Sequence, residues 1–277
     1  MPHEPAPTIE KPQSRHGFII SAMYLVLSGG IFCSVLGFFG EFDWRLDLLS
    51  HFREQYTVFF LILTLITLLL KSHRLAAIAA FFFFMNASLF LPFYLSPKQP
   101  VTSGGLLIMS ANVRRDSNDY QAITSYIQHA NPDIIMLTEM NERWFRSLMP
   151  LKKTYPFVLK EVREDYSGIV MYSKLPLTRT HILHSGNEHI PSLVAEVTED
   201  NKTITIMGTH PLPPFGKRSA HARDEKLKQL GDYMTELKTP AVLVGDFNAT
   251  PFSYPYRRLL HETELRNCAD GYGYQPT

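Results

Sequence analysis

The sequence predicts an α/β (α+β) domain of mixed β-sheets covered by helices, preceded by about three transmembrane helices. Two observations support this prediction. The chain is bipartite, because residues 17–97 are apolar, aromatic-rich and almost free of charge, whereas the part after Val101 has the composition of a soluble domain. In that second part, short apolar runs occur both as strand-helix-strand units and as a hairpin, and this combination gives sheets of mixed strand direction.

The N-terminal part is expected to cross the membrane at about residues 17–40, 55–70 and 75–95. Residues 17–40 carry no charged side chain and exceed the roughly 20 residues that a helix needs to cross a bilayer. This run is also longer than the apolar core of a cleaved signal peptide, which has about 7–15 residues. The tight connection at residues 71–74 leaves a different number of spans open. We therefore expect an integral, multi-pass protein whose first partner is the lipid bilayer.

Basic residues in short loops predict the orientation, because they prefer the cytoplasmic side. Lys11, Arg15, Lys71 and Arg74 flank one side of the predicted spans, and the loop at residues 41–54 is less basic. Residues 1–16 are accordingly predicted to be a cytoplasmic tail. The C-terminal domain, residues 106–277, is predicted on the non-cytoplasmic side of an inner or plasma membrane, after a proline- and glycine-containing linker at 98–105.

The elements of the C-terminal domain follow from hydrophobic periodicity. Asp200 and Asn201 lie between two alternating runs, which is the pattern of a hairpin. The predicted strands are 106–111, 134–137, 157–159, 168–172, 192–197, 203–207 and 241–244, and the predicted helices are 118–130, 217–237 and 254–261.

Composition excludes several classes of function. From Val101 onward, Lys and Arg equal Asp and Glu at twenty each, so the domain lacks the basic excess of a general nucleic-acid binder. The two cysteines, Cys33 and Cys268, cannot form a disulfide framework or a cysteine zinc cluster. The sequence also has no glycine-rich phosphate loop, no Gly-x-Ser-x-Gly elbow and no His-Glu-x-x-His run, which argues against nucleotide-driven transfer, serine hydrolysis and zinc peptidase chemistry.

Polar residues at the ends of predicted strands are the candidate site. They are Asn112, Glu139 and His210, each directly after an apolar run, and Asp246 and Asn248 in the segment VGDFN. Each has an ordinary explanation when taken singly, as a turn, a helix cap or a strand end. Their recurrence at four strand ends in one domain favours a functional site, because a rigid strand fixes a side chain while the following loop leaves room for a substrate.

The chemistry of these residues is mutually consistent. Glu139 is a hard oxygen ligand that suits Mg²⁺ or Mn²⁺, and Asn112 and Asn248 can hold a ligand or water without adding charge. Asp246 could orient or activate water. His210 could donate a hydrogen bond to a phosphoryl oxygen or protonate a leaving group near neutral pH.

The order of these motifs resembles that of the endonuclease/exonuclease/phosphatase superfamily. The resemblance rests on SANV at 110–113, PDIIMLTE at 132–139, SGIVMYSKLPL at 167–177, GTHPLPP at 208–214 and VGDFNATP at 244–251, and it spans nearly all of residues 106–277. It implies a four-layer sandwich, in which two packed mixed sheets are flanked by helices and the site lies at one edge.

The resemblance also implies a role for each candidate residue. Glu139 would be the metal ligand with Asn112 beside it, Asp246 and Asn248 would position the attacking water and a phosphate oxygen, and His210 would contact the scissile phosphate or assist the leaving group. Arg114 and Arg115, which follow the first strand, could bind an anionic substrate, although exposed basic residues are more often solvated surface.

The sequence departs from the family at its C-terminal end. Members usually close with an isoleucine-aspartate strand and a serine-aspartate-histidine motif, and neither occurs before Thr277, so the last strands of the domain are expected to be missing. The leading hypothesis is a metal-dependent phosphodiesterase, nuclease or phosphatase acting on nucleic acid, phospholipid headgroups or small phosphorylated compounds. The alternative is a catalytically inactive, membrane-tethered binding or scaffold domain of the same fold. A transporter is disfavoured because the predicted spans contain few polar residues, mainly Asn86 and a few Ser and Thr.

Overall fold

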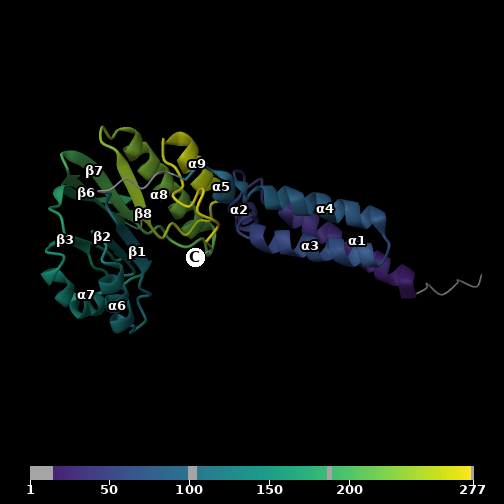
Figure 1. Cartoon of the computed structure of the whole chain (residues 1–277), viewed down its shortest axis with the longest axis horizontal. Helices are drawn as coiled ribbons and strands as arrows, with labels where there is room; N and C mark the ends of the chain where they lie inside the picture. Colours follow the sequence, from purple (N-terminus) through teal and green to yellow (C-terminus); the bar gives the residue numbers. More distant parts are fainter. Residues whose placement is uncertain (1–14, 99–104, 186–188, 276–277) are drawn as a thin grey trace, which may run out of the picture.

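The computed structural model describes residues 15–98, 105–185 and 189–275. They form an elongated helical region and a β-sandwich (Figure 1). The predicted tail at 1–16 and linker at 98–105 fall largely on residues 1–14 and 99–104, outside the described residues.

The helical region consists of three long helices and two short ones. The long helices α1 (Arg15–Leu36), α3 (Arg53–Leu69) and α4 (His73–Ser88) run side by side away from the sandwich (Figure 1). The short helices α2 (Trp44–Ser50) and α5 (Leu91–Leu95) lie at the end nearest the sandwich. The predicted external loop at 41–54 therefore contains a helix.

The structure does not support the predicted number of about three spans. One stretch, Gly17–Leu36, is long and apolar enough to cross a membrane, and a second exists only if α2 and α3 count as one span across a bend of 58°. The predicted span at 75–95 is interrupted between α4 and α5. With 17 and 16 residues, α3 and α4 each extend only about 25 Å at 1.5 Å per residue, less than the roughly 30 Å of a hydrocarbon core.

The C-terminal domain contains two four-stranded sheets of mixed direction, as predicted. The first has the order β1-β2-β4-β3 and the second β5-β6-β7-β8. Their strands are β1 (Ile108–Asn112), β2 (Ile134–Thr138), β3 (Phe157–Glu161), β4 (Ile169–Ser173), β5 (Thr178–Ser185), β6 (Ile190–Glu199), β7 (Lys202–Thr209) and β8 (Ala241–Gly245). Among the described residues, only the pairs β1–β2 and β7–β8 are parallel.

Helices cover the outer faces of both sheets, which confirms the four-layer arrangement. The first sheet carries α6 (Tyr120–Ala130), α7 (Glu142–Ser147) and the short 3-10 helix η1 (Met149–Lys153), and the second carries α8 (Lys217–Thr235) and α9 (Tyr254–Glu262). Between the sheets, Met136 and Met171 pack with Leu193 and Ile206 in an apolar core. Apolar burial of this kind is the main stabilising contribution to folding.

The predicted hairpin at Asp200 and Asn201 is confirmed. Both residues have positive φ, +48° and +62°, and they join β6 to β7. Two positive φ values match the two-residue turns that follow the twist of antiparallel strands.

The helical region docks directly against the sandwich. Phe90 and Phe93 beside and within α5 form an aromatic cluster with Phe252 and Tyr274 of the C-terminal domain, with ring centroids 4.9–6.2 Å apart across the contact. The backbone N–H of Gly273 also donates to the carbonyl of Phe93 at 2.7 Å. The two regions thus share a packed interface.

Candidate active site

Two parallel strand pairs bring the candidate residues to one edge of the sandwich. Asn112 is the last residue of β1 and pairs in register with the end of β2, which Glu139 follows. In the second sheet, Thr209 pairs with Gly245, so His210 and Asp246 leave β7 and β8 side by side. Because β8 contacts both β1 and β2, the four strand ends meet.

Hydrogen bonds connect three of these side chains. The Asn112 amide nitrogen donates to Glu139 Oε1 at 2.8 Å and to Asp246 Oδ2 at 3.1 Å. His210 Nε2 lies 3.8 Å from Asp246 Oδ2. His210 is almost fully buried, and its Nδ1 has no hydrogen-bond partner among the described residues. The arrangement places two carboxylates and an imidazole around one amide.

The backbone at this edge adopts unusual conformations. Glu139 and Asn248 have φ values of +60° and +48°, and Arg114 has +54°. Gly245 has a φ of +143°, and a Cβ there would overlap the carbonyl of Thr209, so only glycine fits between the ends of β7 and β8. Residues held in such regions cost free energy and need surrounding structure to hold them.

Asn248 ties the loop after β8 to the loop after β7. Its backbone N–H donates to Asp246 Oδ1 at 3.0 Å, and its amide nitrogen donates to the carbonyl of Pro211 at 2.8 Å. The turn at 246–248 is therefore fixed relative to His210.

The donor set is compatible with a hard divalent cation. No group of three or more His, Cys, Asp and Glu side chains placed to hold a metal ion occurs in the described part of the chain. Magnesium commonly needs only one or two carboxylates, with waters and substrate phosphates completing its coordination. Glu139 and Asp246 could supply these. Asn112 directs its amide nitrogen to both, whereas its Oδ1 accepts from the N–H of Arg114.

The two predicted substrate-binding arginines differ. The Arg115 guanidinium stacks 4.1 Å from the Tyr166 ring and donates to the carbonyl of Glu164, while its backbone N–H donates to Glu139 Oε2 at 3.0 Å. Arg114 is exposed, and among the described residues no side-chain hydrogen bond or ion pair is recorded for it. Of these two arginines, Arg114 is the one whose guanidinium is available for an anion.

One residue behind the site was missed by the sequence reasoning. Arg223 is fully buried in α8 and donates to the carbonyl of Asn248 at 3.2 Å. The sequence held a signal for it, because Arg223 occupies a helical stripe otherwise made of Ala220, Leu227 and Leu230. A charged residue in an apolar stripe indicates a buried partner.

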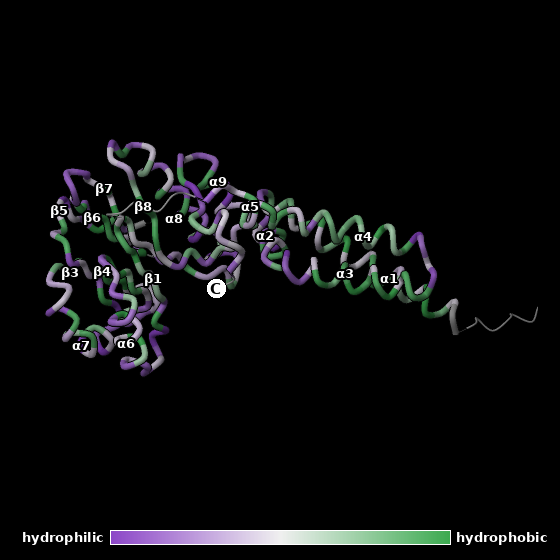
Figure 2. Tube along the Cα trace, in the orientation of Figure 1, coloured by the Kyte–Doolittle hydropathy of each residue, from purple (hydrophilic) through white to green (hydrophobic). Residues whose placement is uncertain are grey.

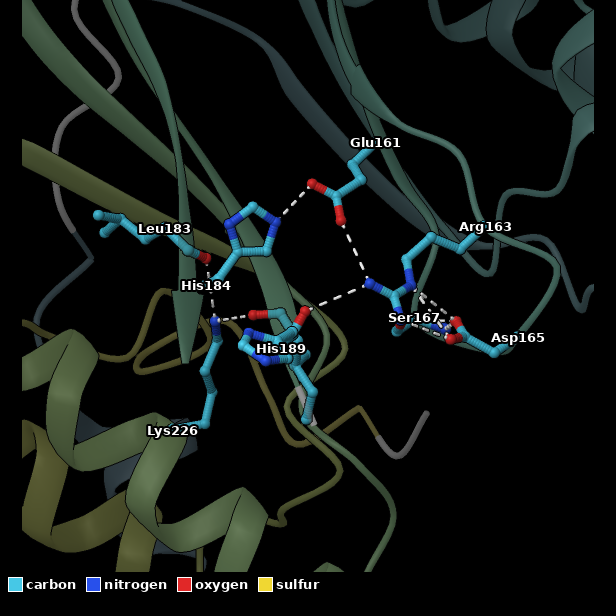
Figure 3. A network of polar contacts seen from close by, with 9 residues as sticks. Glu161, Arg163, Asp165, Ser167, Leu183, His184, His189 and Lys226 are labelled. Carbon is cyan, nitrogen blue, oxygen red and sulfur yellow. Dashed lines mark hydrogen bonds and ion pairs between the residues drawn. The ribbon is translucent and has the colours of Figure 1, made fainter. Parts of the chain in front are cut away.

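A second polar network lies at the same end of the sheets, where Glu161 of β3 is in register with Ile169 and Thr138 (Figure 3). His184 Nε2 lies 2.7 Å from Glu161 Oε2, and Arg163 contacts both Glu161 and Asp165. Lys226 donates to the carbonyl of Ile190 at 2.6 Å, and burial lowers the pKa of Lys226 to about 7. The Lys226 contact joins α8 to β6, and the His184–Glu161 contact joins β5 to β3. The network contains no candidate site residue.

A cavity of about 420 Å³ lies at the junction of the helical region and the sandwich. Its lining includes Trp44, Lys217, His221 and Arg258. It contains none of the candidate residues, which occupy the strand ends instead.

The sandwich matches a known family. The sequence model of the Endonuclease/Exonuclease/phosphatase family matches residues 109–277. No curated protein sequence matches the chain.

Solved structures show the same fold at low identity. A β-hairpin deletion mutant of beta toxin from Staphylococcus aureus matches with a TM-score of 0.50 and 16% identity over 60% of this chain and 75% of that one. Sphingomyelinase C from Streptomyces griseocarneus gives 0.49 and 16% over 60% and 72%. D. rerio TDP2 complexed with a single-strand DNA product gives 0.48 and 18% over 56% and 64%. The chain spans 63% to 64% of the length of two D. rerio TDP2 chains that it matches.

Proposed function

The chain belongs to the Endonuclease/Exonuclease/phosphatase family, and from this premise we propose that it is a membrane-anchored hydrolase of phosphate esters that depends on Mg²⁺ or Mn²⁺. The observation that carries the proposal is the convergence of Asn112, Glu139, His210 and Asp246 at one edge, with hydrogen bonds from Asn112 to both carboxylates. A structural role alone would not require two carboxylates, a buried histidine and an asparagine at four strand ends.

In this proposal Glu139 is the main metal ligand. Its two oxygens are oriented by Asn112 and by the backbone N–H of Arg115, which holds the carboxylate in one position. The ion, when bound, would offset the charge that develops on phosphate oxygens. Asn112 lies beside it and would contribute its oxygen only after rotation of the amide, an orientation that is assigned from hydrogen bonding.

The remaining residues act on water and on the leaving group. Asp246, with a half-exposed carboxylate, orients the attacking water, and Asn248 fixes the turn and meets a phosphate oxygen. His210 donates a proton or a hydrogen bond from Nε2 to the phosphoryl group or the departing oxygen. Arg114 supplies a cation for the substrate phosphate.

The exposed apolar surface of the helical region supports the anchoring. Leu25 is 77% exposed, Leu69 82% and Phe84 67%, and hydrophobic residues run along the whole helical region (Figure 2). Large apolar surfaces of this kind mark contact with a membrane or a partner. Lys71 and Arg74 lie at the end of the helices far from the sandwich, which fits a cytoplasmic position for that end and a non-cytoplasmic one for the domain.

The charge of the domain and its proposed anchoring bear on the class of substrate. The soluble domain has equal numbers of acidic and basic residues, and the anchor would bring it close to lipid. Both features favour phospholipid headgroups or small phosphorylated compounds over long nucleic acids.

The test is hydrolysis of a generic phosphodiester by the full chain, with Mg²⁺ or with a chelator. Glu139→Gln should lower the metal-dependent rate by about a hundredfold or more, the size of effect seen when one group that stabilises transition-state charge is removed. Glu142→Gln, at a nearby exposed position, is the matched control and should retain activity. Full activity of Glu139→Gln would contradict the assignment. An inactive wild type that still binds phosphate esters would support the scaffold alternative.

A further inference from the structure

Arg223 joins the candidate site to the helical region. Its guanidinium is completely buried and donates hydrogen bonds to three described residues. Nη1 donates to the carbonyl of Asn248 at 3.2 Å, Nη2 to Asp47 Oδ2 at 2.8 Å, and Nε to Asp224 Oδ1 at 2.8 Å. Asp224 is its neighbour in sequence and is partly exposed. The buried carboxylate that meets the buried guanidinium therefore comes from a residue 176 positions earlier.

Asp47 is buried, and both of its carboxylate oxygens accept hydrogen bonds from the C-terminal domain. It lies on α2 and is 1% exposed. Its Oδ1 accepts from the backbone N–H of Tyr254, the first residue of α9, at 2.7 Å. The side chain of Ser253, which precedes α9, makes no capping hydrogen bond, so Asp47 supplies the acceptor for this helix end.

The surroundings of Asp47 favour its charged form. Burial alone would raise the pKa of Asp47, but the neighbouring His51 ring, the hydrogen bond from Tyr254 and the Arg223 charge hold that pKa below its usual value. Gly40 packs directly against Asp47, and a Cβ there would come within 2.9 Å of its Cα and Oδ1. The pair is thus enclosed by both regions of the chain.

The pair of Asp47 and Arg223 contacts the turn from Asp246 to Asn248. The carbonyl held by Arg223 belongs to Asn248, whose φ of +48° is in the left-handed region. The same residue donates to Asp246 and to Pro211. Because a residue in that region needs surrounding contacts to hold it, the guanidinium is one of the groups that fix the turn from Asp246 to Asn248.

We propose that Asp47, a residue of the helical region, is a positioning residue of the candidate active site, because it holds Arg223 against the carbonyl of Asn248 and so fixes the turn that carries Asp246. This inference rests on the proposed function for its kinetic consequence, but its structural consequence can be measured separately. In this arrangement the helical region forms part of the support of the site as well as an anchor.

The experiment uses the full chain in detergent micelles and compares Asp47→Asn with Asp43→Asn. Asp43 caps α2 through its side chain and pairs with the exposed Arg45, and asparagine retains the capping function, so this control removes a charge from the same segment without touching Arg223. The first readout is amide hydrogen exchange of residues 246–250, which needs no activity. The second is hydrolysis of a generic phosphodiester, resolved into kcat and KM.

Asp47→Asn should speed exchange at residues 246–250 and lower kcat by about ten- to hundredfold, because small misplacements of a reacting group have effects of this size. KM should change by less than about twofold, since the substrate phosphate still meets the same groups. Asp47→Glu should restore part of the rate, and Asp43→Asn should match the wild type in both readouts. Unchanged exchange at 246–250 in folded Asp47→Asn overturns the proposal.

A double variant separates positioning from simple loss of stability. Asp47→Leu combined with Arg223→Met removes both buried charges and keeps apolar volume, a change that folded proteins often tolerate. If Asp47 positions the turn through Arg223, the double variant folds and remains slow, with fast exchange at 246–250. Recovery of wild-type kcat and exchange would show that Asp47 matters only as a counter-ion, which overturns the proposal. A wild type without hydrolysis would defeat the proposed function, and the exchange comparison would still decide this inference.

Discussion

The sandwich and the helical region differ in how many large apolar side chains they leave exposed. In the sandwich, Leu137 and Leu193 are fully buried, as expected for a domain in water. In the helical region, Leu25 and Leu69 are mostly exposed, whereas the polar Ser34, Thr67 and Asn86 are fully buried.

The interior of the helical region contains buried hydrogen bonds as well as an apolar cluster that includes Phe60 and Leu75. The Ser34 hydroxyl donates to Asn86 Oδ1 at 3.1 Å, and Arg53 donates to the Ser34 carbonyl at 2.8 Å and to Asn86 Oδ1 at 3.2 Å. Under the proposed anchoring, the outer faces of these helices would meet lipid, where polar groups must find partners inside the protein. The two regions therefore differ in their outer surfaces, because that of the helical region carries large apolar side chains suited to a membrane or a partner.

The same substitution should therefore have different effects in the two regions. Leu137→Ala, in the core of the first sheet, should lower the free energy of unfolding by about 2–5 kcal/mol through lost contacts and a cavity. Leu25→Ala, on the exposed face of α1, should change it by less than about 0.5 kcal/mol. Denaturant titration of the full chain in micelles measures both. Equal losses would show that the helical region packs like a soluble domain.

Buried cations in the two regions should differ in their response to pH. The Lys226 pKa is lowered to about 7, so between about pH 7 and 10.5 the unfolded chain binds more protons than the folded one. Stability should rise as pH increases through that range, by an amount on the order of a few kcal/mol at most. Arg53 cannot contribute, since an arginine stays charged.

Lys226→Met isolates this effect. Unfolding midpoints measured at pH 6.5 and pH 10 should differ in the wild type, and the difference should largely disappear in the variant, which keeps the volume of the side chain. A slope that survives Lys226→Met would place its origin elsewhere in the molecule.

The polar interior of the helical region should resist replacement by an apolar side chain. Asn86→Leu removes the acceptor of Ser34 and Arg53 and leaves their donors buried, at a cost of about 1–3 kcal/mol. Ser88→Ala, at an exposed hydroxyl on the same helix, is the control and should be nearly neutral. Helix content followed during thermal unfolding compares the two, and a more stable Asn86→Leu would contradict a stabilising role for these buried hydrogen bonds.

Substitutions in turns should give the smallest difference in stability between the two regions. Lys71, between α3 and α4, has a φ of +57°, and Asn201, between β6 and β7, has +62°. Glycine relieves more strain where it replaces lysine, because asparagine already tolerates this region. Lys71→Gly should stabilise the chain by about 0.5–1 kcal/mol and Asn201→Gly by a few tenths, measured as shifts of the unfolding midpoint. The reverse order would indicate an added role for the Lys71 charge.

Much of the sandwich could be predicted because its signals are local. Alternating apolar runs identified β6 and β7, and Asp200 and Asn201 marked their turn. By contrast, β5 was missed, because its sequence TRTHILHS contains mostly polar residues. An edge strand is held by backbone hydrogen bonds to one neighbour, and these leave no apolar pattern in the sequence.

The candidate site was predictable residue by residue but not as a network. Strand ends indicated Asn112, Glu139, His210 and Asp246, yet nothing local showed that the amide of Asn112 connects the two carboxylates. In the same way, the segment of α2 suggested an external loop. Its helix is stabilised by a contact of Asp47 with a part of the chain that follows much later.

The aromatic contact of Phe90 and Phe93 with Phe252 and Tyr274 has a consequence for reach. A domain on a flexible tether samples a volume set by the length of its linker, and that volume determines its effective concentration near a target. Here the domain is fixed to the helices at both sides of the linker, so extending residues 98–105 would not enlarge its range. Under the proposed anchoring, the strand ends stay at a constant height above the bilayer, and substrates at other heights must travel to them.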